Sequence, residues 1–144
     1  MLKNNFMKNN LALDFMKSLL LFGIAFVLLV TTAPIGFVYT LVRQIFSLKF
    51  RWLTIYFIEV AIALDAAGNV LMQHLLNDML LIKKEPTYYF GNKKETISSV
   101  LGKNELTNTL SVLGKALNSF LNAIDNGHAL NSIQYDVKRW REDN

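Results

Sequence analysis

An uncharged run from Ser18 to Val42 constrains the fold of this chain more than any other stretch. Its 25 residues are mostly Leu, Val, Ile, Phe and Ala, and they lie between Lys17 and Arg43. About 20 apolar residues suffice to cross a bilayer core, and as a helix this run extends about 37 Å at about 1.5 Å per residue. The sequence therefore predicts a transmembrane helix, and with it a location in a membrane.

The predicted anchor differs from a cleaved signal peptide. Lysines before an apolar run are typical of a secretory signal, but Pro34 directly follows the small residues Thr-Thr-Ala, and the apolar run continues beyond them. We expect an uncleaved helix that begins near Leu11 and bends near Val30, because the proline removes a backbone hydrogen bond. Thr31 and Thr32 are expected to bind the freed carbonyl groups.

A second apolar stretch, Trp52–Ile82, carries charges that make a membrane crossing unfavourable. Glu59, Asp65 and Asp78 would each cost roughly 2.5–3.5 kcal/mol at the centre of a lipid-exposed span. We therefore expect a long amphipathic helix that lies on the membrane or packs on the C-terminal region. A second crossing is the alternative.

A line of polar residues on this second stretch is the most informative pattern in the chain. Four side chains recur every four residues and share one face of a helix: Asp65, Asn69, Gln73 and Asn77. His74 and Asp78 form a second pair at the same spacing. The line predicts either the solvent face of an amphipathic helix, which is the commoner case, or a polar face inside a bundle that holds a partner's backbone, a lipid head group or an ion. Asn and Gln favour the second interpretation slightly, because solvated faces usually carry Lys and Glu.

Beyond this stretch the sequence predicts an extended connector and a short helix. Pro86 disfavours a helical conformation of the residue before it, and the Thr-Tyr-Tyr-Phe sequence at 87–90 favours extended backbone. Asn92 and Glu95 have the spacing of a capping box. We expect a helix that Asn92 caps and that stops at Gly102.

Two more helices are predicted in the C-terminal third. Apolar residues spaced 4, 3, 4, 3 and 4 positions apart predict an amphipathic helix from Leu106 to Ile124, whose other face is polar but uncharged. The Asn-Gly pair at 126–127 is expected to close it in the left-handed conformation. A last short helix is predicted from Leu130 to Trp140.

These elements predict an all-α protein with a kinked N-terminal transmembrane helix, a long amphipathic second helix and a small C-terminal helical region. The chain divides into residues 1–51, an anchor with polar flanks, and residues 52–144, a helical region that is membrane-associated or cytoplasmic. The lysines that continue into this second part favour the cytoplasmic side.

Composition and charge exclude several kinds of chemistry. The chain has no cysteine, which rules out disulfides, thiolate zinc sites and cysteine nucleophiles. Residues 1–82 carry six basic and four acidic side chains, and residues 83–144 carry nine and seven, so the net charge of +4 is shared equally. No basic stripe of the kind that binds nucleic acid results. Without an HExxH sequence or a phosphate-binding glycine motif, we expect neither a metal nor a cofactor.

Three segments carry a family-like pattern. They are Ile62–Asp65 together with Asn69, the Glu-Thr-x-Ser-Ser stretch inside Gly91–Lys103, and the Ile-Asp-x-Gly-His stretch Ile124–His128. In these segments the chain resembles small, mostly uncharacterised proteins encoded by phages and prophages of Gram-negative hosts. The resemblance covers about half of the chain and omits the anchor, and it implies an origin but no mechanism.

The polar positions that match the group are candidate site residues: Asp65, Asn69, Glu95, Ser98, Ser99, Asp125 and His128. The group often has arginine where this chain has Val100, proline at Asn126 and cysteine at Ala129. A site that needs a guanidinium or a thiol beside His128 is therefore in doubt. The matching residues predict either a shared polar centre or a framework of helix caps and turns.

Two functions follow from these observations. The first is a small integral membrane protein of phage origin that acts non-enzymatically at the host inner membrane, with the lipid bilayer and itself or another membrane protein as partners. Lysis, exclusion of competing phage and envelope remodelling are roles of this kind. The second is a membrane-tethered hydrolase or lipid-acting enzyme that uses Asp65, Glu95, Asp125 and His128. A cluster of these four around a cavity would favour the enzyme.

Overall fold

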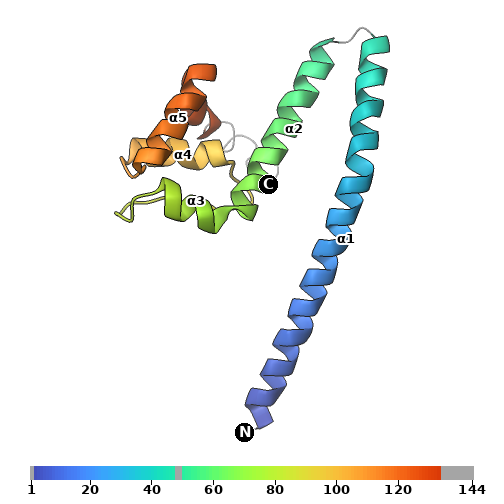
Figure 1. Cartoon of the computed structure of the whole chain (residues 1–144), viewed down its shortest axis with the longest axis vertical. Helices are drawn as coiled ribbons and strands as arrows, with labels where there is room; N and C mark the ends of the chain where they lie inside the picture. The colour runs from blue at the N-terminus through green and yellow to red at the C-terminus, as the bar shows by residue number, and fades with distance from the viewer. Residues whose placement is uncertain (1, 48–49, 134–144) are drawn as a thin grey trace. The chain divides into compact units, whose positions relative to one another are not determined.

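The computed structural model describes residues 2–47 and 50–133, with side chains described from Leu11 onwards. The regular elements in these residues are helices, so the predicted all-α class is confirmed (Figure 1). The chain divides into two compact units, Met1–Ile55 and Tyr56–Asn144.

The first unit contains α1, Leu2–Phe46, a single helix that includes the whole predicted anchor. It begins at Leu2 instead of near Leu11, because no proline or glycine interrupts the residues before the apolar run. The helix continues through Pro34.

The threonines before this proline bind other carbonyl groups than we expected. Thr31 Oγ1 donates to the carbonyl of Val27 at 2.7 Å, and Thr32 Oγ1 donates to that of Leu28 at 2.7 Å. The carbonyl that the proline leaves free belongs to Val30, four residues before it. A threonine in a helix reaches back three or four residues and cannot bind a carbonyl one or two residues away. The prediction that these hydroxyls satisfy the freed group is therefore wrong.

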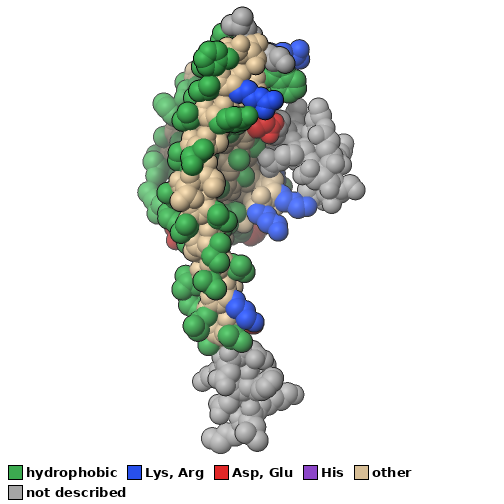
Figure 2. Space-filling model, turned by 90° about the vertical axis from the view of Figure 1, so that its right-hand side faces the viewer, with side chains coloured by type: hydrophobic (Ala, Val, Ile, Leu, Met, Phe, Trp, Pro, Cys, Tyr) green, Lys and Arg blue, Asp and Glu red, His purple; other side chains and the backbone are tan. Residues whose placement is uncertain are grey.

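In the part of the chain that the structure describes, two helices are long and apolar enough to cross a membrane, Leu11–Phe46 and Phe50–Leu71. From Leu11 onwards the side chains of α1 are exposed, apart from three that are half-buried: Thr40, Leu41 and Gln44. Figure 2 shows hydrophobic side chains along the coloured part of this helix. So large an exposed apolar surface is typical of a helix that lies in lipid or is covered by a partner.

The predicted second helix, Trp52–Ile82, is in fact two helices, α2 (Phe50–Leu71) and α3 (Gln73–Leu80). Met72 separates them with φ −103° and ψ 13°, and Figure 1 shows the chain changing direction there. The polar line continues with the same spacing across this point, so the hydrophobic pattern contains no signal for the break.

The fourth helix, α4, runs from Ile97 to Leu106 and is capped by Thr96, whose side chain accepts a hydrogen bond from the backbone of Ser99 at 3.1 Å. The predicted cap at Asn92 is wrong. The side chain of Asn92 instead accepts from the backbone of Lys94 at 3.1 Å, which forms a turn before the helix.

The helix α4 also continues through Gly102, where we expected it to stop. This glycine is buried, and a Cβ atom there would lie 2.7 Å from the carbonyl carbon of Ala129. The glycine therefore allows the backbone of the segment 128–133 to approach α4 closely, and it does not end the helix.

The helix α5 runs from Val112 to Ile124, so the predicted helix over Leu106–Ile124 is wrong in its first turns. Asn108 has a positive φ of 54°, which ends the α4 segment. Residues 81 and 110 then form an isolated antiparallel bridge, and Ser111 caps α5 by accepting from the backbone of Gly114 at 3.1 Å.

The chain beyond α5 turns at Gly127, which has φ 74°, and is helical again over 128–133. This helix starts before Leu130, and its predicted end at Trp140 lies outside the described residues. The core of the second unit is small, with these buried apolar side chains: Leu80, Leu81, Phe90, Val100, Leu101, Leu110 and Ala129. As many polar side chains are buried beside them: Asn69, Thr96, Ser98, Ser99, Asn104, Thr109 and Asn118.

Candidate functional site

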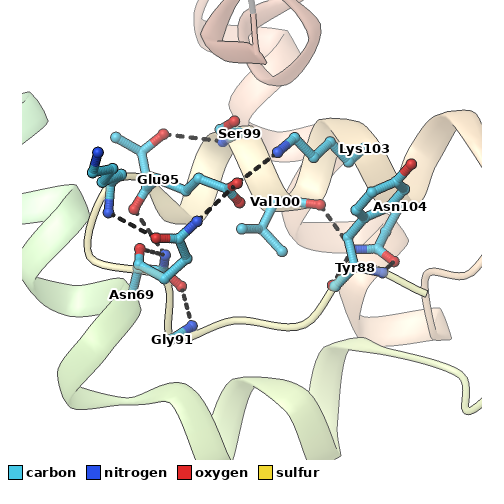
Figure 3. A network of polar contacts seen from close by, with 11 residues as sticks. Asn69, Tyr88, Gly91, Glu95, Ser99, Val100, Lys103 and Asn104 are labelled. Atoms are coloured by element: carbon cyan, nitrogen blue, oxygen red, sulfur yellow. Dashed lines mark hydrogen bonds and ion pairs between the residues drawn. The ribbon is translucent and has the colours of Figure 1, made fainter. Parts of the chain in front are cut away.

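The polar line on α2 and α3 holds the backbone of the connector, residues 81–96, which joins α3 to α4. Asn69 is fully buried, and its Nδ2 donates to the carbonyls of Asn92 at 2.9 Å and Glu95 at 2.8 Å. Its Oδ1 accepts from the backbone of Gly91 at 2.9 Å (Figure 3). The interpretation of this line as a solvent face is therefore wrong. The line faces inward, and the backbone groups that it binds belong to this same chain and not to a partner.

Two further asparagines hold the extended part of the connector in the manner of a neighbouring strand. Asn77 accepts from the backbone N–H of Phe90 at 2.8 Å and donates to its carbonyl at 3.2 Å. Asn104 on α4 does the same for Tyr88, at 3.1 and 2.7 Å (Figure 3). Each amide satisfies both backbone groups of one residue, which removes the cost of burying them unpaired.

Asp65 is a cap for α4. Its Oδ1 accepts from the backbone of Ile97 at 3.1 Å, and its Oδ2 accepts from the backbone of Ser98 at 3.3 Å and from the Ser98 hydroxyl at 2.8 Å. A carboxylate at a helix N-terminus satisfies free N–H groups and interacts favourably with the helix dipole. Asp65 and Ser98 are therefore occupied with holding α4 in place.

The remaining residue of the line, Gln73, and the neighbouring pair His74 and Asp78 differ in what surrounds their side chains. Gln73 packs over Gly91, where a Cβ would lie 3.1 Å from the Gln73 side-chain carbon Cδ. His74 is exposed, and Asp78 forms an exposed ion pair with Lys83 at 3.7 Å.

Glu95 forms a half-buried ion pair with Lys103 at 2.8 Å (Figure 3). It also accepts from the side chain of Asn92 at 3.1 Å. Ser99 is buried, and its hydroxyl makes no hydrogen bond within the described part of the chain.

A cavity of about 430 Å³ brings together residues from three segments of the second unit. Its lining comprises Ile58, Ala61, Ile62, Asp65, Thr96, Asp125, His128, Asn131 and Ser132. Three of the four residues expected in an enzyme site are among them, while Glu95 is not. Asp125 Oδ2 lies 3.1 Å from His128 Nδ1, and the Ser132 hydroxyl donates to the His128 carbonyl at 2.8 Å.

This cavity has part of the geometry of a catalytic site. A carboxylate beside Nδ1 can orient a histidine that acts as a base. Both oxygens of Asp65, however, are already bound to α4, and the Ser132 hydroxyl is bound to a backbone carbonyl. Among residues 2–47 and 50–133 no group of three or more His, Asp or Glu side chains is placed to hold a metal ion.

Sequence reasoning missed the role of Asn104. It lies four residues after the buried Val100, on the face of α4 that packs into the core. A polar residue at a core position of an amphipathic pattern is a signal for a buried hydrogen-bonding role. Asn104 also donates to the carbonyl of Val100 at 2.8 Å and accepts from the Thr109 hydroxyl at 2.6 Å.

Comparisons of the chain with known protein families, with curated proteins and with solved structures found no match.

Proposed function

We propose that this protein is an integral membrane protein that α1 anchors, and that it acts without catalysis by presenting its second unit to lipid or protein partners at the membrane. The observation that carries the proposal is the exposed, apolar length of α1 from Leu11 to Phe46. In water such a surface would be a strong liability for aggregation, whereas lipid covers it fully.

The second apolar helix supports a single crossing. Asp65 and Asn69 hold α4 and the connector, so these positions of α2 belong to the folded second unit. The 15 residues from Phe50 to Leu64 extend about 22 Å, which is shorter than a bilayer core of about 30 Å. This length favours α2 as a helix at the membrane boundary.

The use of the polar residues supports a non-enzymatic role. Of the candidate site residues, Asp65, Asn69 and Asn77 bind backbone groups of this chain and Glu95 pairs with Lys103. The cavity beside Asp125 and His128 is the observation that favours the hydrolase. Its Ser132 hydroxyl already donates to the backbone carbonyl of His128, and its Thr96 hydroxyl caps α4. An origin in a phage, with the host inner membrane as location, stays a prediction from the resemblance.

Vesicle flotation tests the anchor. Full-length protein synthesised in the presence of phosphatidylcholine vesicles is expected to float with them through a density gradient, because the apolar length of α1 partitions into the bilayer. A variant without residues 18–42 is the control and is expected to remain at the bottom. Full-length protein that also remains at the bottom would contradict the proposal.

A further inference from the structure

The helix α5 exposes the apolar side of its amphipathic pattern. Its outward residues include Val112, Leu113, Phe120 and Ile124, which are 88%, 47%, 62% and 71% exposed. Ala116 lies among them and is also exposed. These five residues, the outer face of α5, form one continuous arc of the helix, because they are spaced at one, three and four positions.

The inward side of α5 carries the small and polar residues. Gly114 and Asn118 are buried, and a Cβ at Gly114 would lie 3.2 Å from the carbonyl carbon of Leu80 on α3. Leu117 and Leu121 are half-buried and pack against the core from this same side. The fold of this unit therefore packs Gly114, Asn118 and these two leucines inward, and it leaves the outer face of α5 exposed in the described chain.

The charges on α5 suit a lipid head-group region. Lys115 is its one charged residue, it is exposed, and it lies one turn from Val112 beside the outer face. A lysine at the edge of an apolar face can place its aliphatic part over lipid and its ammonium group near phosphate. The helix Val112–Ile124 itself carries no carboxylate, which anionic lipid would repel. The exposed carboxylate of Asp125, which follows it, lies 3.1 Å from Nδ1 of His128.

Apolar exposure on neighbouring helices favours lipid over a second copy of the chain. Leu71 at the end of α2 is 72% exposed, and Leu75 and Met79 on α3 are 56% and 48% exposed. A dimer interface covers a single patch with matched shape. Lipid covers apolar residues on several helices without shape matching. A membrane anchor also raises the local concentration of lipid around the second unit.

We propose that the outer face of α5 inserts into the surface of the bilayer as an in-plane amphipathic helix. This inference rests on the proposed function, because α1 supplies the attachment to the membrane. The face would lie about 5–10 Å below the phosphate level, the depth typical of such helices, with Lys115 at the phosphates.

Spin labels can measure this depth in the intact chain, because it has no cysteine of its own. Phe120→Cys and Val112→Cys are labelled separately in full-length protein reconstituted into vesicles of phosphatidylcholine and phosphatidylglycerol. Both labels are expected to collide several-fold more often with oxygen, relative to a water-soluble nickel chelate, than a label at Lys93→Cys on the exposed connector. Circular dichroism of each variant checks that the helices are retained.

The outcomes separate this inference from the proposed function. Protein that floats with the vesicles but has a Phe120→Cys label as accessible to nickel as the Lys93→Cys label overturns the insertion of α5 and leaves the anchor intact. Dipolar broadening between labels at position 120, removed by dilution with unlabelled protein, overturns it in favour of a second copy. Protein that does not float contradicts both proposals.

Discussion

Asn69→Asp is expected to lower the free energy of unfolding of the second unit by about 3–5 kcal/mol. The substitution keeps the shape of the side chain but replaces an amide donor by a carboxylate oxygen. That oxygen would lie against the carbonyls of Asn92 and Glu95, which now accept at 2.9 and 2.8 Å from the amide. Both carbonyls lose the donor that Asn69 supplies, although that of Asn92 keeps the backbone N–H of Glu95 at 3.0 Å. The carboxylate keeps the N–H of Gly91 but is a buried charge without a cationic partner.

Urea titration of the full chain in mild detergent, followed by near-ultraviolet circular dichroism, measures this loss. Asn126→Asp is the matched control, because Asn126 is exposed in the turn after α5, and it is expected to change stability by less than about 0.5 kcal/mol. Equal midpoints for Asn69→Asp and the unsubstituted protein would show that this amide does not hold the connector.

Charges in the middle of α1 are expected to have the largest effect on insertion. Each lysine near the centre of a span costs about 2.5–3.5 kcal/mol, so Phe26→Lys with Val30→Lys together cost about 5–7 kcal/mol if the two add. Both side chains are more than half exposed in the structure, so the substitutions disturb no packing within the described chain. The fraction of full-length protein recovered with cell membranes, at equal expression, is therefore expected to fall.

Phe46→Lys is the control for this pair. Phe46 is the last residue of α1 and is 85% exposed, so a lysine there can reach the head groups. Its membrane recovery is expected to match the unsubstituted protein. Recovery of the double variant at that same level would place the membrane contact somewhere other than the middle of α1.

The features that the sequence predicted correctly are those set by local patterns. Hydrophobic length alone indicated α1, and the four-residue spacing of Asp65 to Asn77 indicated one polar helix face. The same spacing could not say what the face binds, because its partners lie up to 33 positions further along the chain, as Ser98 does from Asp65.

The breaks between helices depended on tertiary contacts and were not predictable. Leu106 and Leu110 continue an apolar helical spacing, but Leu110 pairs with Leu81 and the chain leaves the helix between them. Gly102 has the signature of a helix end, yet the close approach of Ala129 explains it. Of the candidate enzyme residues, Asp65, Asp125 and His128 line one cavity. Glu95 does not line it and forms an ion pair with Lys103.

Extraction of membranes with alkaline carbonate shows whether α1 anchors the protein in a bilayer. Carbonate strips proteins held by charge or by protein contacts and leaves those with a helix through the lipid. We expect the full chain to stay in the membrane pellet. Release into the supernatant, under conditions that keep a known spanning protein in the pellet, would contradict it.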